Sequence, residues 1–388
     1  MKKNQFSKIL LLILVIGLSI NQSLTVKSSA DEYENKKALW IQDAFNTLNN
    51  DGYDRIKAIS YWHEDWDNGG IIGESHLRLD SSNDALNAYR IGVSNPKFIT
   101  EAKWENTSRG IKLVPNPKGI YHGAYPDFND TEDSITSEAI TGFEELVGKN
   151  ILWVYFTNPW MEHIEFPVNA VETIHNLGII PFIRMFPISS YDRPAPDPVY
   201  TLQKIIDGDY DTDLIKWVQD SKAMAIPLII EFGTEVNGDW FAWNGKWNGG
   251  CQSGPERFRD AYRHIIDIFR DENATDITWV FHVDDYFDPE DPCTNMSVYY
   301  PGDDYIDWIG ISIYGALNRF DEWNSFSDLM EKAYPYFSAI SSEKPLVLLE
   351  FGVIEPDSFI LTVSVISSAI FIGIIALVVI IVRRKKKI

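Results

Sequence analysis

The chain has little of what metal, phosphate or serine chemistry requires. Among its 388 residues it has two cysteines and seven histidines, and the histidines are scattered without the spacing of a metal site. It contains no glycine-rich phosphate loop, no Gly-x-Ser-x-Gly nucleophile motif, no low-complexity segment and no short-period repeat. The sequence therefore predicts an ordinary globular protein that uses neither a metal nor a cofactor.

Basic residues are also scarce. The chain has 34 lysines and arginines against 56 aspartates and glutamates. Nine of the basic residues and none of the acidic ones lie outside residues 31–358, so this segment carries a net charge of −31. Such a surface repels phosphate backbones, so we expect no nucleic acid and no anionic polymer as a partner.

Both ends of the chain indicate export and anchoring. Residues 1–30 have the basic start, short apolar run and small terminal residues of a signal peptide, with an uncleaved N-terminal anchor as the alternative. Phe359–Val382 contains no charge and is long enough for a transmembrane helix. The basic residues in 383–388 then predict a cytoplasmic tail. We expect a single-pass protein of the cell membrane whose residues 31–358 are extracellular, where Cys251 and Cys293 could form a disulfide.

Residues 119–353 alternate apolar strand-like runs with helix-compatible stretches, which is typical of parallel βαβ units. Seven such runs are one short of a (β/α)8 barrel. The runs are Gly119–Tyr125, Asn150–Thr157, Gly178–Phe186, Ile226–Phe232, Ile277–Val283, Asp307–Tyr314 and Lys344–Phe351.

The N-terminal segment, residues 31–100, predicts the missing unit. Lys36–Asn49 is amphipathic, Arg55–Trp62 is strand-like, and Ser82–Gly92 is a second helix with a good N-terminal cap. We therefore predict an α/β fold, a circularly permuted (β/α)8 TIM barrel whose eighth strand and its flanking helices come from the N-terminus. The alternatives are a remnant of a duplicated upstream barrel and a segment that completes the barrel of a neighbouring chain.

Two carboxylates stand at the ends of predicted strands, where the reacting groups of such barrels lie. Glu235 follows the run that ends at Phe232, and Glu350 lies at the end of the last run. A charge that ends an apolar strand is costly unless it is paired or functional. A structural salt bridge is the alternative for either residue alone.

The motif Thr-Glu-Val-Asn-Gly-Asp-Trp-Phe-Ala-Trp-Asn-Gly at 234–245, together with Leu-Leu-Glu-Phe-Gly at 348–352, resembles glycoside hydrolase family 26. The resemblance implies a retaining glycosidase in which Glu235 is the acid/base and Glu350 is the nucleophile. It further implies that Tyr314 hydrogen-bonds the nucleophile. The chain departs from the family's mannanases at Thr234, where they usually have a histidine.

Further candidates for substrate contact come from the same strand ends and from the loop after Glu235. Tryptophan faces stack on sugar rings, although each of these residues could instead serve core packing. The predicted substrate-binding residues are Asn237, Trp240, Trp243, Tyr314, Trp62, His282 and Arg184.

These features predict a retaining endo-β-glycoside hydrolase that acts on an extracellular β-linked polysaccharide, with β-1,4-mannan or a related β-glycan as the first candidate. The first alternative is a catalytically weak or inactive membrane-bound protein that binds carbohydrate on the same barrel. The second is a surface adhesion or structural protein, because a fold alone does not determine a function. The oligomeric state does not follow from the sequence.

Overall fold

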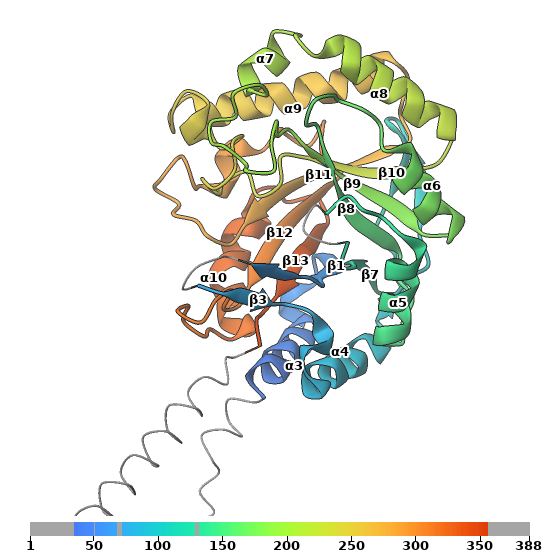
Figure 1. The fold of residues 1–388 in the computed structure, drawn as a ribbon, viewed down its shortest axis with the longest axis vertical. Coiled ribbons are helices and arrows are strands. Elements are labelled where there is room, and N and C mark those ends of the chain that lie inside the picture. The colour runs from blue at the N-terminus through green and yellow to red at the C-terminus, as the bar shows by residue number, and fades with distance from the viewer. Residues whose placement is uncertain (1–34, 50, 68–71, 129–131, 356–388) are drawn as a thin grey trace, which may run out of the picture. The chain divides into compact units, whose positions relative to one another are not determined.

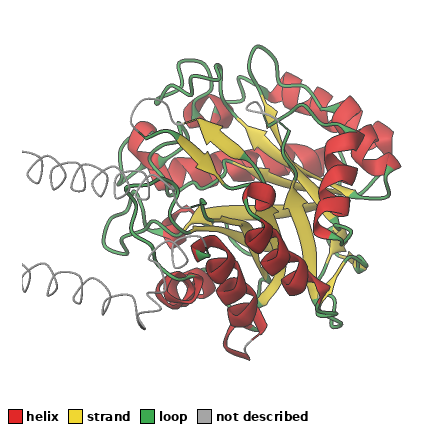
Figure 2. Cartoon of the chain, turned by 60° about the horizontal axis from the view of Figure 1, so that its bottom comes forward, coloured by secondary structure: helices red, strands yellow, loops and turns green. Residues whose placement is uncertain are grey.

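The computed structural model describes residues 35–49, 51–67, 72–128 and 132–355. Within this part of the chain no helix is both long and apolar enough to cross a membrane. The predicted signal peptide, transmembrane helix and basic tail lie outside the described residues. The compact unit Lys37–Glu355 is a ring of parallel strands surrounded by helices (Figures 1 and 2).

Eight parallel strands close into a barrel, which confirms the predicted (β/α)8 fold. Each pairs with the next, and the last pairs with the first. All begin and end within three residues of the predicted runs. They are β1 (Ile56–Trp62), β7 (Ile120–Tyr125), β8 (Trp153–Pro159), β9 (Ile180–Phe186), β10 (Leu228–Phe232), β11 (Ile277–Asp284), β12 (Trp308–Tyr314) and β13 (Leu346–Gly352).

The N-terminal strand β1 closes the barrel within one chain. It lies between β13 and β7, and Ile59 is in register with Leu348 on one side and with His122 on the other. In Figure 1 the blue β1 therefore lies beside the red β13, although nearly 300 residues separate them in sequence. This confirms the predicted pairing. That the order arose by circular permutation stays a prediction.

The helices cover the outside of the barrel (Figure 2). Several begin at side-chain caps, as at Ser82, whose hydroxyl accepts from the Ala85 amide. The helices are α3 (Lys36–Asn49), α4 (Asn83–Ser94), α5 (Ser137–Val147), α6 (Val168–Asn176), α7 (Leu202–Ile206), α8 (Asp211–Met224), α9 (Gly254–Asp271) and α10 (Phe326–Ala339).

Aromatic packing fixes the N-terminal segment to the rest of the barrel. Trp40 of α3 packs edge-on against Phe326 of α10, with ring centroids 5.3 Å apart. Tyr61 of β1 is fully buried. Its ring packs edge-on against Tyr89 of α4 at 5.0 Å and against Phe351 of β13 at 5.2 Å. The two helices and the strand are therefore part of the main core, and their burial contributes to the stability of the whole barrel.

The segment between α4 and β7 reaches the end of the barrel opposite the site. It contains β4 (Phe98–Ile99) and a hairpin of β5 (Trp104–Thr107) and β6 (Gly110–Leu113). The Leu113 amide donates to the Thr278 hydroxyl at 2.9 Å, and the Leu113 carbonyl accepts from the indole N–H of Trp308 at 2.8 Å. These residues begin β11 and β12, so the hairpin covers the N-terminal ends of the strands and leaves the C-terminal ends for the site.

Candidate active site

A cavity of about 880 Å³ lies at the C-terminal ends of the barrel strands. Six of the nine residues predicted for the site line it: Trp62, Arg184, Glu235, Trp240, Tyr314 and Glu350. Asn237, Trp243 and His282 lie just behind its wall and are at most 2% exposed. The barrel thus brings together, at the C-terminal ends of its strands, residues that are far apart in sequence.

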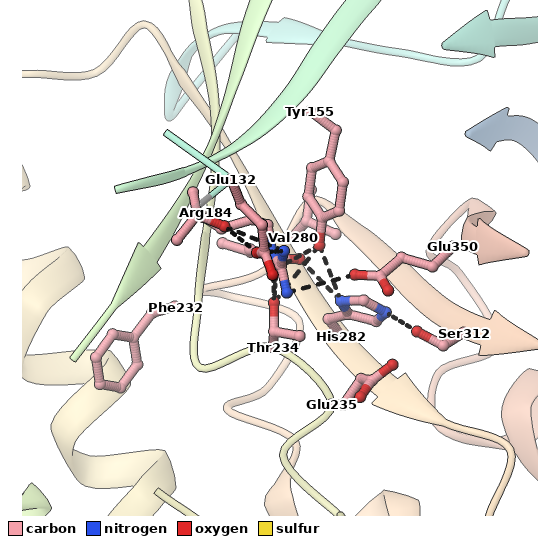
Figure 3. Close-up of polar contacts among 12 residues, drawn as sticks. Glu132, Tyr155, Arg184, Phe232, Thr234, Glu235, Val280, His282, Ser312 and Glu350 are labelled. Atoms are coloured by element: carbon pink, nitrogen blue, oxygen red, sulfur yellow. Dashed lines mark hydrogen bonds and ion pairs between the residues drawn. The ribbon is translucent and has the colours of Figure 1, made fainter. Parts of the chain in front are cut away.

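The two predicted catalytic carboxylates face each other across the imidazole of His282 (Figure 3). Glu235, His282 and Glu350 each place one oxygen or nitrogen within 4.8 Å of the others. Such a triplet could hold a metal ion, but both ring nitrogens of His282 already have partners. One lies 3.1 Å from Glu231 and the other 2.9 Å from the hydroxyl of Ser312. The donor set therefore favours an organic ligand over a metal.

The two carboxyl oxygens of Glu350 have different neighbours. The Tyr314 hydroxyl donates to Oε2 at 2.8 Å, as the resemblance implied. Oε1 has no hydrogen-bond partner among the described residues, and Nη2 of Arg184 lies 3.6 Å away from it. Burial raises the pKa of Glu350 to about 7, against the opposing charge of Arg184.

Glu235 stands on a sharply turned backbone. Its φ is +47°, and Gly233 two residues earlier is at +69°. A left-handed conformation is unfavourable for a residue with a Cβ, so its presence here indicates that neighbouring contacts impose it. One of those contacts is the indole N–H of Trp240, which donates to Oε2 of Glu235 at 2.9 Å. Trp240 is 41% exposed, so one surface of its ring remains available to a ligand.

Trp243 and Asn237 hold the loops in place behind the cavity wall. Trp243 stacks under Phe241 with ring centroids 4.4 Å apart, and its indole N–H donates to the Thr234 carbonyl at 2.7 Å. The Asn237 amide donates to the carbonyls of Asp284 and Tyr286 at 3.0 and 3.1 Å. Each residue therefore positions its loop, and neither belongs to the surface that lines the cavity.

A disulfide joins the same two loops. Cys251, in the loop after β10, is bonded to Cys293, in the loop after β11. The Asn244 amide also donates to the Cys293 carbonyl at 3.0 Å. The cross-link anticipated from the sequence thus fixes the loop that carries Glu235 to its neighbour.

Arg184 lies at the centre of a buried polar network (Figure 3). Its guanidinium donates to Glu132 at 2.7 Å and to the Thr234 hydroxyl at 3.1 Å. Burial would raise the pKa of Glu132, but the charges of Arg184 and Arg193 outweigh it and lower that pKa. The network therefore keeps an arginine charged and fixed beside Glu350.

The Thr234 position, where the resemblance led us to expect a histidine, belongs to this network. Its hydroxyl accepts from Arg184 and donates to Glu231. Glu231 in turn accepts from the Tyr155 hydroxyl at 2.6 Å. Burial would lower the pKa of His282, but the neighbouring Glu231 carboxylate raises it. The imidazole beside Glu235 and Glu350 therefore belongs to His282 of β11. Thr234, the residue before Glu235, hydrogen-bonds within the buried network around Arg184.

The lining of the cavity also contains residues that sequence reasoning missed. Trp62 stacks on Tyr125 with ring centroids 3.9 Å apart. The indole N–H groups of Trp62 and Trp66 both donate to Glu64, at 3.0 and 2.7 Å. Burial and the charge of Glu132 raise the pKa of Glu64 to about 8. Glu64, Asp284 and Asp285 follow or end barrel strands, so the rule that selected Glu235 would have found them as well.

Comparison with known proteins supports the resemblance over part of the chain. Residues 199–344 match the model of glycosyl hydrolase family 26. This segment contains Glu235 and ends six residues before Glu350.

Proteins with similar sequences match only part of this chain. Endoglucanase H of Acetivibrio thermocellus is 29% identical over 253 residues, which are 64% of this chain and 25% of that protein. A mannan endo-1,4-beta-mannosidase of Bifidobacterium adolescentis is 26% identical over 135 residues, 34% of this chain and 13% of that protein. A beta-1,3-xylanase of an Alcaligenes species is 26% identical over 149 residues, 38% and 28% of the two chains. The chain thus spans about a quarter of the length of Endoglucanase H.

Two solved structures are similar to this chain over part of its length. A mannanase of Bacillus subtilis has a TM-score of 0.39 at 16% identity, over 57% of this chain and 77% of that one. A GH26A protein of Muricauda has a TM-score of 0.41 at 16% identity, over 58% and 76% of the two chains.

Proposed function

We propose that this chain is a retaining endo-β-glycoside hydrolase that cleaves a β-linked polysaccharide, β-1,4-mannan or a related β-glycan. The observation that carries the proposal is the pairing of Glu235 and Glu350 within 4.8 Å in the main cavity. Retaining enzymes need carboxyl groups about 5–5.5 Å apart, whereas inverting enzymes leave room for a water between more distant ones. The family 26 segment around Glu235 supports the same reaction class.

In the proposed reaction each carboxyl has its own role. Oε1 of Glu350, the oxygen that does not accept from Tyr314, attacks the anomeric carbon while the bond to the leaving oxygen breaks. Glu235 gives its proton to that oxygen. In the second step Glu235 takes a proton from water, and the water oxygen displaces Glu350 from the sugar. Tyr314 holds Oε2 and thereby orients Oε1 for both steps.

A panel of soluble glycans tests the proposal. We expect the purified full-length chain to release reducing ends from at least one of mannan, glucomannan, mixed-linkage glucan and xylan. The product should first appear with the β configuration of the substrate, which NMR of the fresh product measures. Binding of a glycan without release of reducing ends would favour the alternative of a carbohydrate-binding protein. Initial release of the α anomer would exclude a retaining mechanism.

The raised pKa of Glu350 predicts an acidic limit to activity. Glu350 must be ionised to attack, and its pKa lies near 7 rather than 4.5. Because kcat/KM reports the free enzyme, it should rise with pH up to about 7. Arg184→Gln removes the charge that lowers this pKa, so its limit should move to higher pH. Arg184→Lys, which keeps a positive charge, should move it less. A limit near pH 4.5 in the unaltered protein would contradict this prediction.

We also propose that the ends of the chain place this activity outside the cell. Residues 1–30 would direct export, and residues 359–382 would anchor the barrel with residues 383–388 in the cytoplasm. The argument rests on the sequence of these segments alone. Protease added to intact cells should remove the barrel and spare a tag placed after residue 388. Protection of the barrel in intact cells would disprove the arrangement.

A further inference from the structure

Acidic residues outnumber basic ones in the lining of the cavity. Nine of the lining residues are acidic and two are basic. Both basic residues, Arg184 and Arg193, are ion-paired with Glu132, at 2.7 and 2.9 Å, and Arg184 also lies 3.6 Å from Glu350. The two arginines are therefore too few to offset all of the lining carboxyl groups. The acidic lining residues are Glu64, Asp67, Glu132, Glu235, Asp284, Asp285, Asp321, Glu322 and Glu350.

Two of these carboxyl groups lie on the wall beside Glu235. Asp284 ends β11, Asp285 follows it, and both line the cavity. Burial raises the pKa of Asp285 to about 7 against the opposing charge of Lys332, and Glu235 raises it further. Burial, Glu235 and Asp285 also raise the pKa of Asp284. Because their pKa values are raised, Asp284 and Asp285 tend to hold protons, and a bound cation would displace these protons.

A further feature of the same cavity indicates a ligand. Trp240 and Tyr286 are 41% and 65% exposed, and their ring centroids lie 6.1 Å apart. These aromatic surfaces stand next to Glu235, Asp284 and Asp285. A ligand that fills this space would combine an apolar ring face with a positive charge.

We propose that the cavity selects β-glycans that carry protonated amino groups, with Asp284 and Asp285 holding the ammonium of the sugar bound beside Glu235. The inference rests on the glycosidase function proposed above and names its substrate class. The hydroxyls of a neutral sugar can donate hydrogen bonds to these carboxyl groups but bring no opposite charge, and an acidic sugar is repelled by the ionised carboxylates. An ammonium group forms charge-assisted hydrogen bonds with both aspartates. The sugar ring would stack on Trp240 or Tyr286.

Matched oligosaccharides separate charge from shape. The full chain is assayed, with a chelator present throughout, on β-1,4-linked glucosamine oligomers and on the same oligomers after N-acetylation. We expect a KM roughly tenfold lower for the charged set. Raising the salt concentration from about 0.05 M to about 0.5 M should remove most of this preference, because salt screens charge. KM for neutral gluco- and manno-oligosaccharides should change little with salt.

Single substitutions locate the effect. Asp285→Asn should reduce the preference for the charged set by roughly fivefold, and Glu322→Gln, at the exposed rim, by less. Asp271→Asn removes the same charge from the exposed end of α9 and should leave the preference unchanged. Equal KM for the two sets, or equal effects of Asp285→Asn and Asp271→Asn, would overturn the inference. Turnover of neutral glycans would leave the proposed function standing in that case, whereas no cleavage of any glycan would overturn both.

Discussion

Glu350→Gln is expected to lower kcat on glycans by on the order of 10⁴-fold or more, because an amide oxygen cannot form the glycosyl-enzyme bond. The amide keeps the shape of the carboxyl and its hydrogen bond from Tyr314, so the fold should survive. It also removes a buried ionisable group whose pKa is raised to about 7. A raised pKa means that the carboxyl disfavours the folded state increasingly as pH rises from 4.5 through 7. The variant should therefore be as stable as the parent at low pH and more stable above pH 7.

Glu235→Gln should behave differently with different leaving groups. On natural glycans, which need a proton on the leaving oxygen, kcat should fall by roughly 10²–10⁴-fold. On aryl glycosides with acidic phenols the first step needs little protonation, so the loss in kcat/KM should be much smaller. The second step still lacks its base, so the glycosyl-enzyme should accumulate. Glu172→Gln, at an exposed position of α6, is the matched control and should change nothing. Wild-type turnover in both Glu235→Gln and Glu350→Gln would refute the assignment of the site.

Tyr61→Ala is expected to reduce the free energy of unfolding by about 3–5 kcal/mol. Tyr61 is fully buried in β1, packs on Tyr89 and Phe351, and donates its hydroxyl to the Leu77 carbonyl at 2.8 Å. Loss of its ring would leave a cavity between β1, α4 and β13. Denaturant unfolding followed by tryptophan fluorescence measures the change.

Leu39→Ala provides the comparison from the same N-terminal segment. Leu39 lies in α3 and is 55% exposed, so its truncation should change stability by no more than about 0.5 kcal/mol. A single cooperative transition in both variants is expected if β1 belongs to the barrel core. An early transition confined to the N-terminal segment would show instead that the barrel stands without it.

The fold could be predicted because parallel barrel strands are buried on both faces and appear in sequence as short apolar runs. The position of Arg55–Trp62 followed from closure, since seven strands would leave two unpaired edges. The hairpin Trp104–Leu113 was not predicted from the sequence. Its polar residues gave no strand signal, because its ends are fixed by contacts with β11 and β12 that lie far along the chain.

The site was predictable where chemistry depends on strand ends and was not where it depends on side-chain direction. Glu235 and Glu350 could be predicted from their positions at strand ends, and Tyr314 from its strand end together with the family resemblance. Trp243 and Trp240 lie three residues apart in one polar loop, and nothing local distinguishes the ring that supports the loop from the ring that lines the cavity. That difference is set by Phe241 and by the Thr234 carbonyl, which become neighbours only when the loop folds.

The left-handed backbone at Glu235 has a consequence for the history of such chains. A residue with a Cβ at φ +47° costs roughly 1–3 kcal/mol relative to the relaxed backbone. Glycine would relieve this cost, and asparagine would reduce it. A barrel that merely held glycans would gain stability from either replacement, so mutational drift would remove the glutamate here early. Among descendants of this chain, a glutamate retained at position 235 should therefore indicate that selection still maintains turnover, and a glycine or asparagine there should indicate that it does not.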